Sequence, residues 1–109
     1  MPPCHAFQRN AAALGRVFVP TYRPAHARTA STDMGNVSHY VPAIHPNLAA
    51  AAADCVMHNA EFVRWAGSEM GDQAAIDCAN ALAMTAIDFF TNANVRADVA
   101  AAFAATGGD

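Results

Sequence analysis

The stretch that most constrains the fold of this chain is a run of helix-forming residues between Ser68 and Phe90. Ser68 is a favoured N-cap residue, and the apolar residues after it recur at helical spacing, so the pattern predicts a helix from about Glu69 to Phe90. Its predicted apolar face consists of Ala75, Ile76, Ala79, Leu82, Ala83, Ala86, Ile87 and Phe90, with Asp72, Asp77 and Asp88 outside it. The length of 109 residues suits a single domain, 1–109.

The composition limits the core that can form around this helix. Hydrophobic residues make up 54% of the chain and charged residues 14%, which argues against intrinsic disorder. Much of the hydrophobic fraction is alanine, which favours helices but buries little area per residue. The core is therefore expected to depend on a few large side chains, namely Phe7, Leu14, Ile44, Phe62, Trp65, Leu82, Ile87 and Phe90.

Shorter elements are predicted on both sides of the long helix. Residues 4–15 carry apolar side chains at helical spacing and end at Gly15, a natural helix stop. Residues 95–103 show the same pattern, and their helix is predicted to stop at Gly107 and Gly108. Two segments are strand-like, Arg16 to Val19 and Val37 to Ile44, although Pro42 makes the second an edge strand or an extended segment. Residues 20–30 are expected to form an exposed loop. These elements predict an α/β fold in which helices pack on one or two short strands.

Several classes of function are disfavoured by the same sequence. A net charge of −3 and the absence of lysine give no cationic surface for nucleic acid. The longest alanine run, Ala49 to Ala53, is too short to span a membrane, and the N-terminus has no secretory signal pattern, so a cytoplasmic protein is expected. Cys4, Cys55 and Cys78 are widely spaced and odd in number, which predicts reduced, packed thiols.

One segment carries more information than its composition. The run STDMGNVSH at 31–39, followed by VPAIHP at 41–46, resembles a segment of the metallopeptidase family numbered twenty. The similar members are aminoacylase-like, hippurate-hydrolase-like and p-aminobenzoyl-glutamate-hydrolase-like amidohydrolases. Residues 7–15, HNAEF at 58–62 and ANALAMTAID at 79–88 agree with the family in order and spacing. The resemblance therefore covers most of the chain and implies the C-terminal portion of a catalytic domain.

The resemblance also implies an activity and roles for particular residues. Such enzymes hydrolyse the amide of an N-acyl amino acid or a dipeptide with water held by zinc or manganese. His58 matches the last metal-binding histidine of the family, although Ala60 stands where the family usually has proline. Thr32 and Asp33 fall in the substrate-side loop, where a turn or helix cap is an equal alternative. His39 is a further substrate-side candidate, with a structural role as its alternative.

The matching region leaves most of the family's machinery outside this chain. The other metal ligands and the general base of the family lie upstream of it, and one imidazole cannot fill a catalytic zinc site. We therefore expect an inactive fragment that does not bind metal stoichiometrically by itself, and that pairs with a missing N-terminal half. Two alternatives stay open. One is a non-enzymatic interaction module or remnant that self-associates, and the other is a small metal protein that uses His39, His45 and His58.

Overall fold

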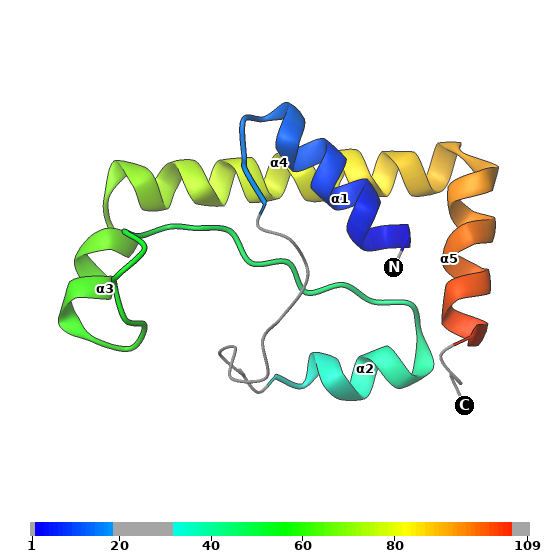
Figure 1. Ribbon diagram of the computed structural model, residues 1–109, viewed down its shortest axis with the longest axis horizontal. Helices are drawn as coiled ribbons and strands as arrows, with labels where there is room; N and C mark the ends of the chain where they lie inside the picture. The colour runs from blue at the N-terminus through cyan, green and yellow to red at the C-terminus, as the bar shows by residue number, and fades with distance from the viewer. Residues whose placement is uncertain (1, 19–31, 106–109) are drawn as a thin grey trace.

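The computed structural model describes residues 2–18 and 32–105, and these residues form five helices with no strand among them. The helices, in chain order, are α1 (Pro2–Ala13), α2 (Met34–Tyr40), α3 (Ala60–Ala66), α4 (Glu69–Thr91) and α5 (Ala93–Ala105). Figure 1 shows that α1 crosses α4, the longest described helix, and that α3 and α5 contact α4 at its two ends. An extended segment at 41–59 returns from α2 to α3.

The core lies where α1 crosses α4. Ala11 of α1 and Ala81 of α4 are completely buried, and small side chains at both positions allow the two helices to approach closely. Phe7 completes the buried cluster and meets the ring of Phe18 edge to face at a centroid separation of 6.2 Å. Ile44 of the extended segment packs against the same cluster. The fold therefore rests on one small contact region, as expected for an alanine-rich chain.

The predicted helices are confirmed, with small changes at their ends. Helix α4 begins after Ser68, whose hydroxyl accepts a hydrogen bond from the Gly71 amide at 3.4 Å. Helix α1 gives way to a turn that ends at Gly15, where φ is +84°, a conformation that glycine adopts readily. The predicted C-terminal helix is α5, and its predicted stop at residues 107–108 lies outside the described residues.

The prediction of an edge strand or an extended segment from Val37 to Ile44 is wrong over its first half. Its first half is the end of helix α2, and its second half is extended but pairs with no described segment. Without a neighbouring strand to supply ladder hydrogen bonds, local helical bonds satisfy the backbone of residues 34–40. Pro42 then ends the helix, because the residue before a proline is driven out of the helical region; Val41 has φ −140° and ψ 150°.

The expectation of an α/β fold is corrected accordingly, because the described residues are α-rich. Arg16 and Val17 are not in a strand, and Val19 lies outside the described residues, as does the loop predicted at 20–30. Val17 is exposed, whereas Phe18 turns back onto Phe7. The apolar character of this segment therefore anchors one aromatic ring in the core and does not build a sheet.

Helix α4 buries the opposite side to the one that its sequence predicts. Its buried residues are Ala74, Asp77 and Ala81. In contrast, Ile76, Ile87 and Phe90 are 55%, 60% and 75% exposed, so the prediction that they lie in the core is wrong for this structure. Predicted core residue Leu82 is exposed as well, whereas Phe62 and Trp65 are half-buried. The long helix thus turns Asp77 and two small alanines inward and its large apolar residues outward.

Hydrogen bonds join the polar side of α4 to α1 and to Arg16, which follows α1. Asp77 accepts hydrogen bonds from Arg16 and from Gln73, at 2.7 and 2.8 Å. Asn10 of α1 donates to Asp88 at 3.0 Å and to the hydroxyl of Thr85 at 3.1 Å. These bonds explain how a polar helix face is tolerated in the interior, because every buried side-chain nitrogen and oxygen of the described residues has a hydrogen-bond partner.

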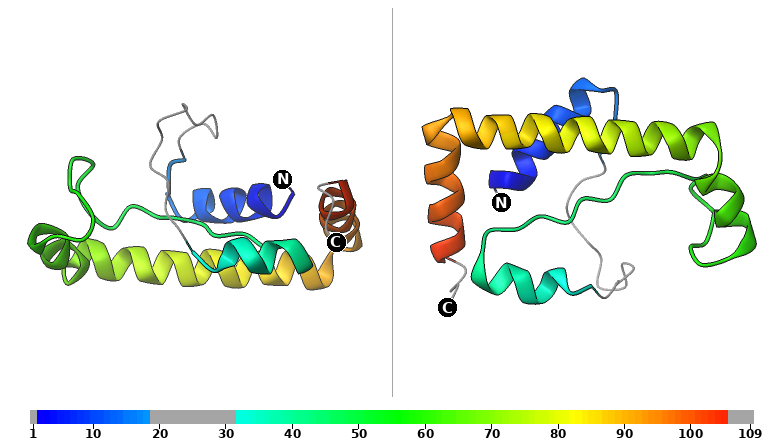
Figure 2. Two further views of the ribbon diagram at one scale, coloured as in Figure 1. Left: turned by 90° about the horizontal axis from the view of Figure 1, so that it is seen from below. Right: turned by 180° about the vertical axis from the view of Figure 1, so that it is seen from behind.

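The molecule is open for its size. Its Cα radius of gyration is 15.5 Å, compared with about 13 Å for a compact domain of this length. Its accessible surface is 7965 Å², whereas a compact monomer of this mass would expose roughly 5,800 Å². Figure 2 shows the reason, since the helices form a flat frame with α1 on one side of α4. The chain consequently exposes far more surface than a self-contained domain does.

By length and composition alone, α4 is long and apolar enough to cross a membrane. Core helices of soluble proteins pass the same test. Asp77 and Asp88 would be costly in hydrocarbon, and here both are held by side chains from α1 and the residues that follow it.

Candidate functional site

Thr32 and Asp33 begin helix α2, which bears on the two roles considered for them. The Thr32 hydroxyl accepts a hydrogen bond from the Met34 amide at 3.4 Å, and its carbonyl accepts one from Gly35 at 3.1 Å. Asp33 occupies the N-cap position, yet its side chain makes no capping bond. The turn role therefore describes Thr32, and the exposed Asp33 carboxylate is not used to cap α2.

His39 lies in the last turn of α2, which is an isolated element. No residue of α2 is buried, and α2 contacts none of the other described helices. Its apolar side chains Val37 and Tyr40 are 42% and 76% exposed. The described part of the segment with the strongest family resemblance, residues 32–39, thus lies largely on the surface, where Met34 is half-buried and the other side chains are exposed.

His58 has an unusual backbone conformation. Its φ is +66°, and it is the one non-glycine residue with positive φ in the described parts of the chain. Histidine is among the residues that enter this left-handed region more often than most, and such positions frequently mark functional sites. The imidazole is exposed, and it directly precedes Asn59, which caps helix α3 by accepting from the Phe62 amide at 2.9 Å.

The left-handed turn and the cap together fix where the His58 side chain leaves the chain. Exposed apolar residues lie on both sides of His58 in the sequence: Val56, Met57 and Val63 are 57%, 46% and 70% exposed. Glu61, in the first turn of α3, is also exposed and favourably placed at a helix N-terminus. The segment therefore combines a positioned imidazole with apolar surface that lacks a covering layer in the described structure.

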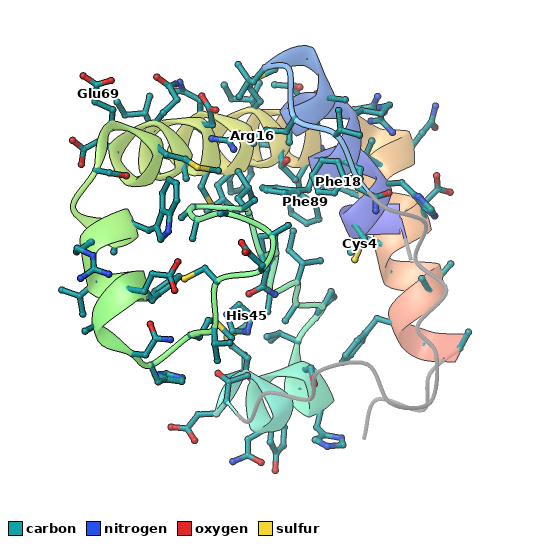
Figure 3. All side chains as sticks on the ribbon, turned by 60° about the vertical axis from the view of Figure 1, so that its left-hand side comes forward. Cys4, Arg16, Phe18, His45, Glu69 and Phe89 are labelled. Carbon is teal, nitrogen blue, oxygen red and sulfur yellow. The ribbon has the colours of Figure 1, made fainter. Side chains whose placement is uncertain are left out.

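The described residues do not form a metal centre by themselves. No group of three or more His, Cys, Asp or Glu side chains within 4–18 and 32–105 is close enough to hold an ion. His39 and His45 are not gathered around His58, so the hypothesis of a stand-alone site built from these three histidines is not supported. Figure 3 shows His45 on the extended segment, well away from Arg16 and α1. A single imidazole does not fit a catalytic metal, which needs about three protein ligands.

The sequence pattern missed one feature of this region. The left-handed conformation of His58 has no local signature other than the Asn59 cap that follows it. The three cysteines behave as predicted, without disulfides: Cys55 is buried and the other two are half-buried. Cys55 lies in the turn that leads to His58, where its amide donates to the Ala52 carbonyl at 3.0 Å.

Comparison with characterised proteins points to a class of hydrolase. The curated proteins that match this chain are dipeptidases, which is consistent with the metallopeptidase family numbered twenty. In particular, the chain is 36% identical over 85 residues to the Xaa-Arg dipeptidase of Mus musculus, and 35% identical over 83 residues to that of Homo sapiens.

The matches cover 78% and 76% of this chain but only 20% and 19% of the two dipeptidases. The chain thus spans about a fifth of the length of these curated relatives. No protein-family model matches the chain, and no solved structure matches it.

Proposed function

We propose that this chain is part of a metal-dependent amidohydrolase or dipeptidase of the metallopeptidase family numbered twenty, and that it contributes one metal ligand and part of the substrate site. The bond cleaved is the amide of an N-acyl amino acid or a dipeptide, in the cytoplasm. The observation that carries the proposal is the similarity to dipeptidases over more than three quarters of the chain.

The local geometry supports specific roles within this proposal. His58 would be the metal ligand, since its imidazole is exposed and its backbone is held in a left-handed turn by the flanking cap. Asp33 and His39 would face the substrate, together with the polar start of α2 at Thr32. Both segments are exposed in the described structure, as a site requires if another polypeptide segment completes it.

The proposal gives this chain no complete reaction of its own. The described residues supply neither a second and third ligand nor a placed general base for the attacking water. Those groups would come from residues corresponding to the four fifths of the relatives that this chain does not match. We therefore expect the isolated chain to be inactive.

A chimaera tests the proposal. The region of the mouse Xaa-Arg dipeptidase that matches this chain is replaced by the corresponding residues of this chain, and dipeptide hydrolysis and bound metal are measured on the same sample. Retained metal-dependent turnover is expected. His58→Ala in the chimaera should lower turnover at least about 100-fold and reduce the metal content, because a lost ligand affects both.

His45→Ala is the matched control, since this histidine is also exposed on the same extended segment. It should leave metal content unchanged. Equal effects of the two substitutions would contradict the role of His58. The isolated chain, assayed with zinc and with manganese, should show no turnover, and turnover by it would disprove the claim that the site is incomplete.

A further inference from the structure

The apolar side of helix α4 has no covering layer in the described structure. Five residues form this α4 outer face: Ile76, Ala79, Ala83, Ile87 and Phe90. They follow one another at intervals of three or four, so they lie on one side of the helix, and all are exposed. The described helices that contact α4 are α1, which lies on its opposite side, and α3 and α5, which lie at its ends.

The order of residues on this face is self-complementary. Two copies of α4 packed antiparallel, with Ala83 opposite Ala83, place Ile76 opposite Phe90 and Ala79 opposite Ile87. The small side chain at the centre lets the helices approach, Ile87 meets the small Ala79, and the large Ile76 and Phe90 pack against each other at the two ends of the contact. No charged residue interrupts the face between Ile76 and Phe90.

The charges at the two ends of α4 match in the same arrangement. Asp72 lies one turn before Ile76, in line with the outer face, and Glu69 lies in the first turn. At the other end, one guanidinium nitrogen of Arg96 donates to the carbonyls of Phe89 and Phe90, at 3.0 and 2.8 Å. Antiparallel pairing brings the acidic start of one helix to the Arg96 end of the other, where the guanidinium has further N–H groups to donate. The two helix dipoles are also opposed.

The chain as a whole exposes more surface than a compact monomer, which leaves surface available for a partner. The chain exposes roughly 2,200 Å² more than a compact monomer of its mass, whereas a standard interface takes about 800 Å² from each partner. We propose that a second copy of this chain covers the α4 outer face, in a two-fold symmetric antiparallel helix pair centred on Ala83. The residues around His58 and α2 belong to other segments of the chain, so this dimer does not depend on the proposed hydrolase function.

Sedimentation equilibrium of the intact chain tests the proposal. Across micromolar concentrations the mass should approach twice 11.4 kDa. Ala83→Glu places two carboxylates against each other at the centre and should weaken association at least about 100-fold. Ala100→Glu is the control, because this alanine is exposed on α5 and the chemical change is the same. A wild-type chain that stays monomeric in solution would overturn the proposal. A chain that is monomeric when bound to neutral phosphatidylcholine vesicles would overturn it as well.

Disulfide trapping gives a second test that does not depend on a destabilised variant. Ala83→Cys should yield a covalent dimer on mild oxidation, above the background of the native cysteines, because position 83 meets itself across the axis. Ile76→Cys should not, since the two copies of position 76 would be about 21 Å apart along the helices at about 1.5 Å per residue. Equal trapping at both positions would indicate a parallel pair and would overturn the antiparallel arrangement.

Discussion

Arg16 and Asp77 form an ion pair at 2.7 Å that joins three parts of the chain. Arg16 follows helix α1, Asp77 lies on the inner side of α4, and a second nitrogen of the guanidinium donates to the Ala49 carbonyl of the extended segment at 3.2 Å. The two side chains are 20% and 12% exposed, so the pair is largely removed from water. Figure 3 shows Arg16 lying along α4.

Removing one partner of this pair should destabilise the protein. Asp77→Leu leaves the Arg16 guanidinium partly buried without its carboxylate, so we expect a loss of about 2 to 3 kcal/mol in the free energy of unfolding. The double variant Arg16→Met, Asp77→Leu should lose less than the single variant, because no uncompensated charge remains. Urea denaturation of the wild type, the single variants Asp77→Leu and Arg16→Met, and the double variant measures the cycle, and additive losses would contradict the pairing.

A methyl group at Gly71 should also be destabilising, although alanine is the better helix former. A Cβ at this position would lie 2.7 Å from the Trp65 carbonyl oxygen and would meet the Ala66 carbonyl oxygen as well. Because these atoms belong to the backbone, they cannot move aside without shifting α3 relative to α4. Gly71→Ala is expected to cost at least about 1 kcal/mol, despite a propensity gain of about 1 kcal/mol.

Gly67→Ala provides the comparison for that substitution. Its added Cβ would meet the Val63 carbonyl oxygen at 3.7 Å, an ordinary contact, and its φ of −91° is open to alanine. The midpoint of urea unfolding should therefore change little for Gly67→Ala and fall for Gly71→Ala. A stabilised Gly71→Ala variant would show that the α3–α4 junction is looser than described.

The contact between α1 and α4 should reject a larger side chain. Ala81 is completely buried against α1, so Ala81→Leu forces the helices apart and should cost about 1 to 3 kcal/mol. Ala101→Leu, on the exposed side of α5, serves as the control and should be nearly neutral. Thermal unfolding followed by circular dichroism compares the two, and equal unfolding temperatures would place Ala81 outside the core.

Two residues at helix N-cap positions should respond differently to alanine. Asn59 accepts from the Phe62 amide at 2.9 Å, so Asn59→Ala should weaken α3 by about 1 kcal/mol. Asp33→Ala removes a side chain that makes no capping bond and should change α2 by a few tenths of a kcal/mol at most. Amide hydrogen exchange in each helix provides the measurement, with faster exchange expected in α3 alone.

Much of the helical structure can be predicted from the sequence. Ser68 marks the start of α4, Gly15 the end of the turn after α1, and residues 95–103 fall within α5, because caps and spacing act through local hydrogen bonds and backbone geometry. The candidate site was predicted only as a set of positions. The resemblance indicated His58 and Thr32. The left-handed conformation of His58 and the isolation of α2, which follows Thr32, became visible only in the structure.

The strand predictions failed for a physical reason. The β-branched residues near Val37 fit a pleated surface only if another strand offers its backbone groups, and no described segment does so. The backbone of residues 34–40 therefore forms helical hydrogen bonds, and the helix ends before Pro42.

The sequence by itself determined the helices α1, α4 and α5, and it showed that α4 has a polar and an apolar side. Only the tertiary structure decided which side faces inward. The bonds from Arg16 to Asp77 and from Asn10 to Asp88 hold the polar side against α1, with Ala11 and Ala81 small enough to let the helices meet. The apolar side, with Ile87 and Phe90, is consequently left at the surface. Periodicity shows which residues share a face of a helix. Which of these faces is buried depends on side chains that are distant in sequence.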